Sequence, residues 1–282
     1  MKSLIEFIQE QDTISYRRLN GLPPPWTDDP VMANYKFGNV RRELDRTNRL
    51  LYSLFATPKY KDKRDVLTIL PNIVANCLAH RLVSCHDFSL RHGFFDSYEA
   101  FENAYNGDRD AGLPVRPTSF ISCISDTNLL KSARVAFKLT NILADYLVRS
   151  QSLESTFYHF KKIVGKFTAW QAALDCVMHG WVANNSDFVH LGPGALFTLN
   201  VLDYPPQDYG TLVSQVNDHI KYLPLRYEEV EGLLCEYGRY VKYNTKWPGK
   251  YRLYSPDPRP LLSVPLDKIF TTAFLIVKER YG

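Results

Sequence analysis

Residues 26–46 of the chain read WTDDPVMANYKFGNVRRELDR, and this stretch decides how the whole sequence is interpreted. Mostly apolar residues recur within and just after it at the spacing of one helix face, at Val40, Leu44, Thr47, Leu51 and Leu54. The pattern predicts one long helix over residues 35–56. A stiff, extended break at residues 21–25, GLPPP, separates this helix from an amphipathic helix that starts the chain.

Polar residues of the predicted helix gather on a different arc and form the first candidate site. On this arc lie Arg42, Asp45, Arg46 and Arg49, with Asn39 at its margin. Because residues three and four apart lie close together on a helix, the arginines can bind phosphate oxygens while the carboxylate orients one of the arginines. The alternative is a solvated helix face whose surface ion pairs contribute about 0–1 kcal/mol each.

The residues just before this helix have two interpretations. Thr27, Asp28 and Asp29 either contact a nucleobase or cap a helical turn that begins at Pro30. Trp26, beside the proline break, either plugs the core or stacks on a base.

Helical periodicity continues along the chain, so the predicted fold is mainly α, a helical bundle with little or no sheet. We expect a single helical domain over residues 1–282, or two lobes near 1–125 and 126–245, with a C-terminal extension at 255–282. Further helices are predicted at residues 64–83, 97–106, 126–149, 152–164, 166–181, 195–202, 209–221, 226–240 and 266–279. Residues 119–124 fit either a strand or a buried turn.

Composition and motif searches exclude several classes of protein. The 282 residues carry a net charge of +4, which is mildly basic and compatible with nucleic acid. No apolar run is long enough to span a membrane, and the start of the chain lacks the basic end of a signal peptide. The sequence also lacks the strand and helix alternation of a Rossmann-like sheet and the Gly-x-x-x-x-Gly-Lys-Ser/Thr loop of P-loop kinases.

The five cysteines are scattered and form no Cys-x-x-Cys pair. Neither a disulfide framework nor a zinc site is expected from this spacing. The chain is therefore interpreted as reduced and intracellular.

A second group of candidate residues lies between residues 163 and 195. Ile163 to Ala169 partly resembles the turn of a helix-hairpin-helix, in which backbone N–H groups at a glycine receive a DNA phosphate. Asp175 lies among apolar neighbours on the following helix and is either exposed or paired, since an unpartnered buried carboxylate is costly. Gly192-Pro193-Gly194 either leaves N–H groups for an anion such as pyrophosphate or forms an ordinary tight turn.

A third group alternates cations with aromatic residues after residue 233. Arg239, Lys242, Lys246, Lys250 and Arg252 are interleaved with Tyr240, Tyr243, Trp247, Tyr251 and Tyr254. This alternation suits single-stranded or flipped-out DNA, with Tyr240 as a stacking residue, and it equally suits a solvated basic loop. Cys235 is expected to be a packed core thiol, because nothing in the sequence indicates the lowered pKa of a nucleophile.

Together these blocks resemble a known family, the alpha-glutamyl/putrescinyl thymine pyrophosphorylases, which are amino-acid:DNA transferases of phage thymidine hypermodification. The same helical domain is found attached to 5-hydroxymethyluracil DNA kinases of phages. The resemblance rests on Trp26–Pro30, Tyr35–Phe37, Asn39–Val40, Arg42–Arg46, Gly165 with Phe167 and Ala169, Asp175, Gly192–Ala195 and Leu234–Tyr237. The chain departs from the family at Ile163, where a glycine is usual, and at Leu196–Thr198, where basic residues are usual.

The resemblance implies a fold similar to the helix-hairpin-helix DNA glycosylases and a different reaction. Asp187 is a candidate for the position of the catalytic aspartate of those glycosylases, but it does not match cleanly, which argues against base excision. The implied substrate is DNA carrying 5-(pyrophosphoryloxymethyl)uracil, in which an amine from an amino acid or a polyamine displaces pyrophosphate. The alternatives are a non-catalytic helical DNA-binding module and a helix-hairpin-helix glycosylase.

The resemblance also implies roles for individual residues. Catalysis is assigned to Asp45, Asp175 and Arg42; phosphate binding to Arg46, Asn39, Gly192 and Gly194; base contacts to Trp26, Asp28, Asp29 and Tyr240; Glu236 and Asp187 complete the set. No metal ligand set is apparent and no cofactor is expected, with Mg²⁺ as the open alternative. The expected partners are modified DNA, a free amino acid or polyamine, and enzymes such as a 5-hydroxymethyluracil DNA kinase, in the cytoplasm of a phage-infected host.

Overall fold

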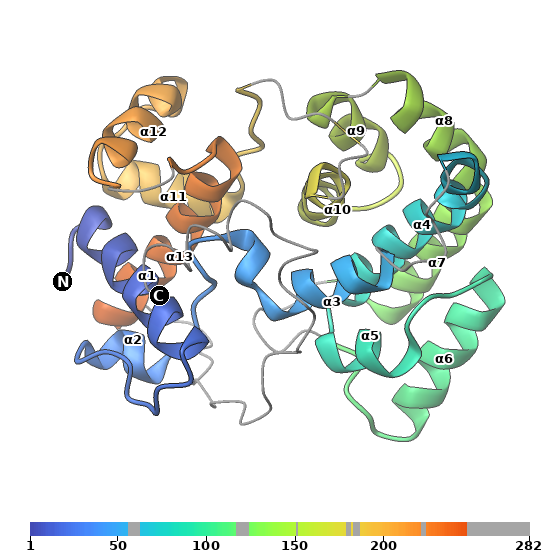
Figure 1. The fold of residues 1–282 in the computed structure, drawn as a ribbon, viewed down its shortest axis with the longest axis horizontal. Coiled ribbons are helices and arrows are strands. Elements are labelled where there is room, and N and C mark those ends of the chain that lie inside the picture. Colours follow the sequence, from blue (N-terminus) through green and yellow to red (C-terminus); the bar gives the residue numbers. More distant parts are fainter. Residues whose placement is uncertain are drawn as a thin grey trace. The chain divides into compact units, whose positions relative to one another are not determined.

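Helices dominate the part of the chain that the structure describes. The computed structural model describes residues 1–55, 63–116, 124–150, 152–178, 182, 187–220 and 224–246. Within these residues there are α-helices and short 3-10 helices and no β-strand (Figure 1). The predicted mainly α fold is therefore confirmed.

The chain divides into two compact units, each with its own set of contacts. Unit 1 consists of residues 1–45 and the described residues from Asp187 onward, and unit 2 consists of residues 46–186. These boundaries differ from the lobes expected near 1–125 and 126–245. The reason is that the N-terminal 45 residues share a core with the helices that follow Asp187.

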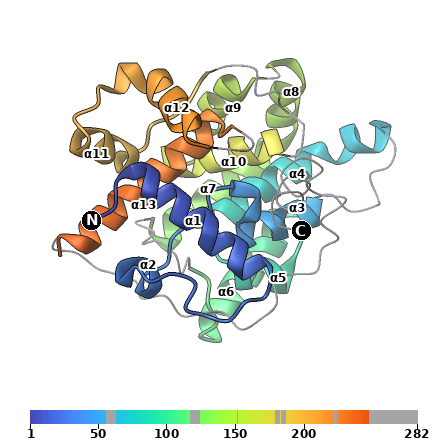
Figure 2. The ribbon, with the colours of Figure 1, turned by 60° about the vertical axis from the view of Figure 1, so that its left-hand side comes forward.

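Unit 1 is built around the long helix α13. Its elements are α1 (Leu4–Leu19), α2 (Pro30–Asn34), η1 (Arg42–Leu44), α11 (Pro193–Val201), η3 (Pro206–Asp208), α12 (Tyr209–Asp218) and α13 (Tyr227–Asn244). Helix α13 packs against α1, α2, α11 and α12 (Figures 1 and 2). Its apolar side is almost fully buried: Leu234 and Tyr240 have exposed fractions of 0% and 1% and belong to the same core cluster as Phe7 of α1.

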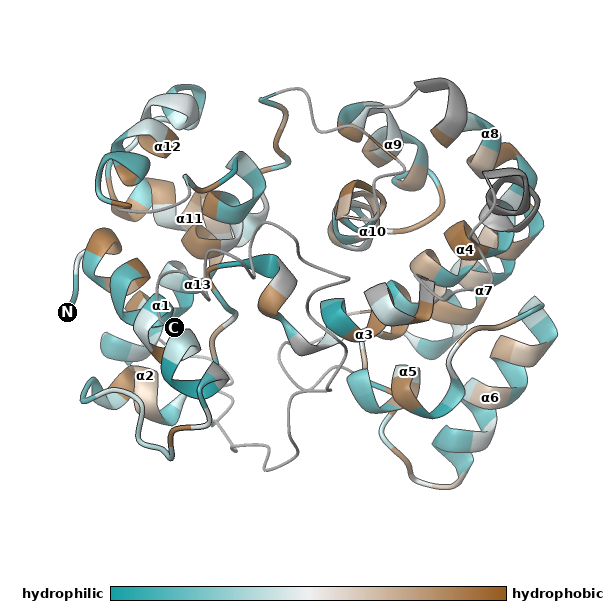
Figure 3. Ribbon diagram, viewed as in Figure 1, coloured by the Kyte–Doolittle hydropathy of each residue, from teal (hydrophilic) through white to brown (hydrophobic). Residues whose placement is uncertain are grey.

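Helix α1 shows how local sequence signals position this core. Ser3 accepts a hydrogen bond from the backbone N–H of Glu6, and the Glu6 carboxylate accepts one from the N–H of Ser3, so a capping box starts the helix. Hydrophobic and hydrophilic residues alternate around its turns (Figure 3). Phe7 and Ile8 lie on the buried side, with exposed fractions of 0% and 1%.

Unit 2 is a bundle arranged around α4. Its elements are α3 (Arg46–Phe55), α4 (Lys63–Val83), α5 (His86–His92), α6 (Tyr98–Asp110), α7 (Asp126–Lys138), α8 (Thr140–Ser150), α9 (Leu153–Phe160) and α10 (Lys166–Met178). Helix α4 packs against α7, α8 and α10, and α9 packs against α10. Pro71 lies inside α4, and the two helices predicted on either side of Gly165 are present as α9 and α10.

The single helix predicted over residues 35–56 is wrong. Helix α2 ends at Asn34, residues 35–41 are not helical, and α3 begins only at Arg46. The Asp45 carboxylate accepts hydrogen bonds from the backbone N–H and the side-chain amide of Asn39, at 3.1 and 2.7 Å. These two bonds close residues 39–45 into a loop, so the predicted polar stripe of one continuous helix does not form.

The helix predicted over residues 126–149 is also divided. It ends at Lys138 and a new helix begins at Thr140. The residue that caps its start is Ser125, whose hydroxyl accepts a hydrogen bond from the N–H of Asn128. The predictions for residues 119–123 and for the segments after residue 246 lie outside the described residues.

Candidate functional site

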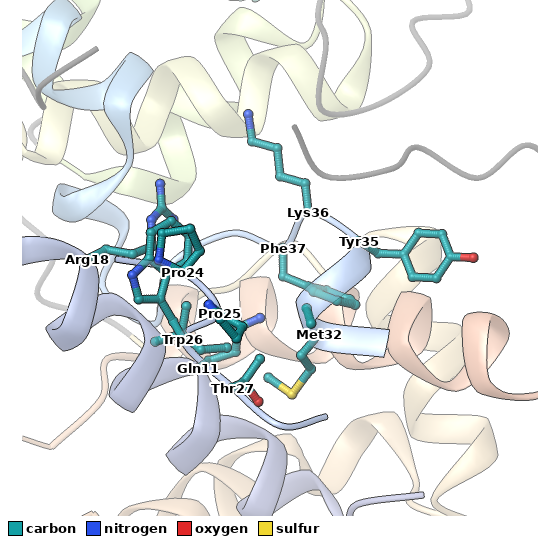
Figure 4. A pocket seen from close by; sticks show the side chains of 12 residues that line it. Gln11, Arg18, Pro24, Pro25, Trp26, Thr27, Met32, Tyr35, Lys36 and Phe37 are labelled. Atoms are coloured by element: carbon teal, nitrogen blue, oxygen red, sulfur yellow. The ribbon is translucent and has the colours of Figure 1, made fainter. Parts of the chain in front are cut away.

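A pocket in unit 1 lies where α1, the proline break and α2 meet. Its volume is about 320 Å³. The residues that line it are Gln11, Ile14 and Arg18 from α1, Pro24, Pro25, Trp26 and Thr27 from the connecting segment, Met32 and Ala33 from α2, and Tyr35, Lys36 and Phe37 from the segment after α2 (Figure 4). The Trp26 block that carries the sequence prediction thus forms much of the wall.

Hydrogen bonds hold this wall against α1. The Arg17 guanidinium donates to the carbonyl oxygen of Trp26 at 2.7 Å, and the Trp26 indole N–H donates to the carbonyl of Leu22 at 2.6 Å. The Thr27 hydroxyl donates to the Glu10 carboxylate at 2.5 Å. Each of these bonds joins the segment to α1 or to itself, so the chain's own contacts hold the wall of the pocket in place.

The lining of the pocket combines aromatic rings with cations. Arg18 lies with its guanidinium carbon 5.3 Å from the centroid of the Trp26 ring, and the two lie together on one side of the pocket, with Met32 and Phe37 on the other (Figure 4). Lys36 lies at the edge of the pocket with its ammonium pointing away from Arg18 and Trp26 (Figure 4), and no aspartate or glutamate is among the described lining residues. A planar, anionic ligand fits these walls, because rings stack on its faces and cations bind its charge.

Asp29 has the capping role that was one of its two interpretations. Its carboxylate accepts from the N–H groups of Val31 and Met32 at 2.9 and 3.0 Å, which starts α2. Its other oxygen accepts from the Tyr240 hydroxyl at 2.8 Å. Asp28 is exposed beside it, and its predicted contact with a base stays a prediction.

The expectation that Tyr240 stacks on a base is wrong. Its side chain is 1% exposed, its ring lies 5.2 Å from the ring of Phe7, and its hydroxyl binds Asp29. The alternation of cations and aromatics in the sequence does not show which aromatics face inward. On α13, Tyr240 and Tyr237 face the core, whereas Tyr243 is half-buried beside Tyr35.

The residues of the predicted polar stripe are distributed over a loop, η1 and α3. Asn39 and Asp45 are bonded to each other, and the Asn39 side-chain oxygen also accepts from the Ser15 hydroxyl of α1 at 3.0 Å. Arg42 lies in η1, and Arg49 is a buried residue of α3 in unit 2. The side chain of Arg46 lies outside the described part of the structure, so its predicted phosphate contact stays a prediction.

Asp175 is buried and paired, which was one of the two interpretations of its sequence context. The Arg81 guanidinium binds both carboxylate oxygens, at 2.6 and 2.5 Å, and also donates to the Asn48 side chain at 2.5 Å. The side chains of Arg81 and Asp175 are 7% and 3% exposed. Asp175 thus lies in the buried core of unit 2, and its predicted catalytic role stays a prediction.

The Gly192-Pro193-Gly194 turn starts α11 as expected, but its first N–H is not free for pyrophosphate. Gly192 donates its N–H to the buried carboxylate of Glu231 at 3.2 Å, so the protein supplies its own anion there. Gly194 is explained by packing, because a Cβ atom at that position would lie 2.4 Å from the sulfur of Cys235.

The remaining predicted residues have separate surroundings. Cys235 is a packed thiol, and burial raises its pKa to about 12, as expected for a residue that is no nucleophile. Glu236 binds the Arg239 guanidinium at 2.7 Å. Asp187 is exposed at the point where the chain re-enters unit 1.

Sequence reasoning missed the contribution of α1 to the pocket. Arg18 and Gln11 lie before the proline break and outside residues 26–46. They come close to Trp26 only in the folded chain. One signal was present: a pair of arginines at residues 17 and 18 lies just before the break, one bonded to the Trp26 carbonyl and one lying over its ring.

The described residues contain neither a cluster of metal-binding side chains nor a helix that could span a membrane. No group of three or more His, Cys, Asp or Glu side chains among them could hold a metal ion. None of the described helices combines the length and the apolar character needed to cross a membrane.

Comparison with known proteins gives one family match and one curated relative. The family model for the helical domain of 5-hmdU DNA kinase matches residues 1–248. A 5-hmdU DNA kinase of Bacillus phage SP10 is 26% identical over 296 aligned positions, which cover 83% of this chain and 44% of the relative. The chain thus matches less than half of that kinase. No solved structure matches.

Proposed function

The chain belongs to the family of the 5-hmdU DNA kinase helical domain, and on this premise we propose that it is a transferase of phage thymidine hypermodification. Its proposed substrate is DNA that carries 5-(pyrophosphoryloxymethyl)uracil, and its second substrate is an amino acid or a polyamine. The observation that carries the proposal is the pocket lined by Trp26, Tyr35 and Phe37 together with Arg18 and Lys36.

The chemistry of this pocket supports a flipped-out, phosphorylated base as the ligand. An enzyme that reacts at a base must take it out of the stack, and aromatic walls replace the stacking that is lost. The pocket volume of about 320 Å³ lies within the range of small-molecule sites, about 300–1,000 Å³. The Arg18 guanidinium beside Trp26 would hold the pyrophosphate and stabilise the charge that develops as it leaves.

The proposed reaction is a displacement at the methylene carbon on C5 of the uracil. The amine nitrogen forms a bond to this carbon, the carbon–oxygen bond breaks, and pyrophosphate departs with the electron pair. A carboxylate must take the proton from the attacking ammonium. We assign this role to Asp45, because both oxygens of Asp175 are already bound by the Arg81 guanidinium.

A single-turnover assay of pyrophosphate release tests these assignments. Arg18→Gln removes a charge that would hold the leaving group, and the expected loss in kcat/KM is about ten- to a hundred-fold. Asp45→Asn keeps an acceptor for Asn39 but removes the base, and the expected loss in rate is about 10²–10⁴-fold. Arg134→Gln is the control, since that arginine is 66% exposed on α7 of unit 2. Full activity in folded Arg18→Gln and Asp45→Asn variants would contradict both roles.

A second candidate function is a DNA-binding module without catalysis. Two observations favour this candidate. The matching family model describes a helical domain of a kinase, and the chain matches 44% of the length of its relative. Such a module would bind DNA in a salt-dependent way and release no pyrophosphate. For the transferase, a kinase acting on 5-hydroxymethyluracil in DNA is the proposed source of the substrate.

A further inference from the structure

We propose that the end of α13 binds the DNA strand that flanks the nucleotide held in the pocket. The surface consists of Lys36, Lys242, Tyr243 and Lys246, and we call it the α13 track. The inference rests on the proposed function, because it assumes that the ligand of the pocket is part of a DNA strand.

The track lies at the C-terminal end of α13. Tyr243 lies one turn beyond Arg239 on the same face of the helix, and Lys242 is the residue before it, in the last turn. Lys246 follows the C-cap Thr245 and is exposed, with a φ of 49°. Lys242 and Tyr243 are half-buried.

Contacts with the pocket wall make the track continuous with the pocket. The Arg239 guanidinium donates to the carbonyl of Lys36 at 2.9 Å and to the Tyr243 hydroxyl at 3.1 Å. The rings of Tyr35 and Tyr243 lie 4.3 Å apart, and the ring of Phe37 lies 5.8 Å from that of Tyr243. Tyr35, Lys36 and Phe37 all line the pocket, so a strand that leaves the pocket over this wall meets α13.

The charge of the track fits phosphate groups. Residues 237–246 hold three cations, Arg239, Lys242 and Lys246, and no carboxylate. Glu236 precedes them and is bound by Arg239 at 2.7 Å, which leaves the two lysines as the cations that offer their charge. The ammonium of Lys242 lies 4.1 Å from the centroid of the Phe197 ring, a contact that positions it and keeps its charge.

The partner is best described as a single strand. Lysines that neutralise phosphates release condensed counterions, and aromatic rings beside them accept the face of an unpaired base. The half-buried Tyr35 and Tyr243 pair supplies such a ring next to the lysines. Cations at a helix C-terminus also interact favourably with the helix dipole, so a test must separate DNA binding from fold stability.

The test is the double variant Lys242→Gln with Lys246→Gln, which removes two charges and keeps side-chain length. Its binding to a single-stranded oligonucleotide with the modified base is measured by fluorescence anisotropy at several salt concentrations. The slope of log K against log salt should become less steep by about 1.4, because each phosphate neutralised on a single strand contributes about 0.7. The control is Lys131→Gln with Lys138→Gln, two exposed lysines of α7, and its slope should stay unchanged.

Two further readouts separate the possible outcomes. The thermal midpoint shows whether the double variant is folded, and calorimetry with free 5-(pyrophosphoryloxymethyl)deoxyuridine reports on the pocket alone. An unchanged slope in a folded variant, or an equal change in the α7 control, overturns the track. If the free nucleoside does not bind but the slope changes, the proposed function fails and the track stands as a DNA-binding surface.

Discussion

Replacing Asp175 tests whether this carboxylate holds the fold of unit 2 or takes part in the reaction. In Asp175→Ala the Arg81 guanidinium loses both oxygens that it binds at 2.5–2.6 Å, while its contact with Asn48 remains. The Arg81 side chain is 7% exposed, so water cannot replace the carboxylate without rearrangement. Removing one partner of a buried ion pair costs about 3–5 kcal/mol, and we expect the free energy of unfolding to fall by that amount.

Urea denaturation followed by circular dichroism measures this loss. Asp110→Asn is the matched control, because that carboxylate is 69% exposed in its pair with Arg109 and its removal should cost less than about 1 kcal/mol. The double variant Arg81→Met with Asp175→Leu should recover much of the stability, since apolar groups of similar volume often replace a buried pair without loss. A stable but inactive Asp175→Asn protein would refute the structural role.

Three further predictions concern stability. Burial is the main cause that lowers the pKa of His80 to about 4, so between pH 6.5 and pH 4 the unfolded chain binds a proton at this residue and the folded chain does not. The free energy of unfolding should therefore fall by about 3 kcal/mol as the pH drops through this interval. A pH series of urea denaturation should show a smaller fall in His80→Gln. Gly194→Ala places a methyl group 2.4 Å from the Cys235 sulfur, and the overpacking should cost about 1–3 kcal/mol in thermal denaturation, part of which Cys235→Ala should restore. Asp45→Ala removes the acceptor of two Asn39 donors and should cost about 1–3 kcal/mol, whereas Asp45→Asn should keep most of the stability; equal stability of both variants would contradict the closed loop.

Helices could be predicted from the sequence where apolar periodicity and caps agree. Helix α1, with its Ser3 and Glu6 capping box, and the pair of helices around Gly165 follow these local signals. The helix expected over residues 35–56 does not form as one element, and apolar periodicity alone does not reveal the cause. The bonds between Asn39 and Asp45 stabilise a loop, and local side-chain bonds of this kind compete with a helix.

The candidate site could be predicted only in part. The segment that begins at Trp26, which the sequence singled out, contributes several of the residues that line the pocket. Its partner Arg18 comes from another helix, and contacts between helices are set by tertiary packing that a single sequence does not display. Tyr240 is a second example. It was expected at the surface because cations neighbour it in the sequence, but packing places it in the core, where it is 1% exposed.

The measurement that tests the central claim most directly is mass spectrometry of nucleosides. DNA carrying 5-(pyrophosphoryloxymethyl)uracil is incubated with the protein and a panel of amino acids and polyamines, with the Arg18→Gln variant in parallel. We predict a nucleoside in which one amine of the panel replaces pyrophosphate, formed much more slowly by the variant. Unchanged DNA that the protein merely binds, or abasic sites in place of the modified base, would contradict the transferase.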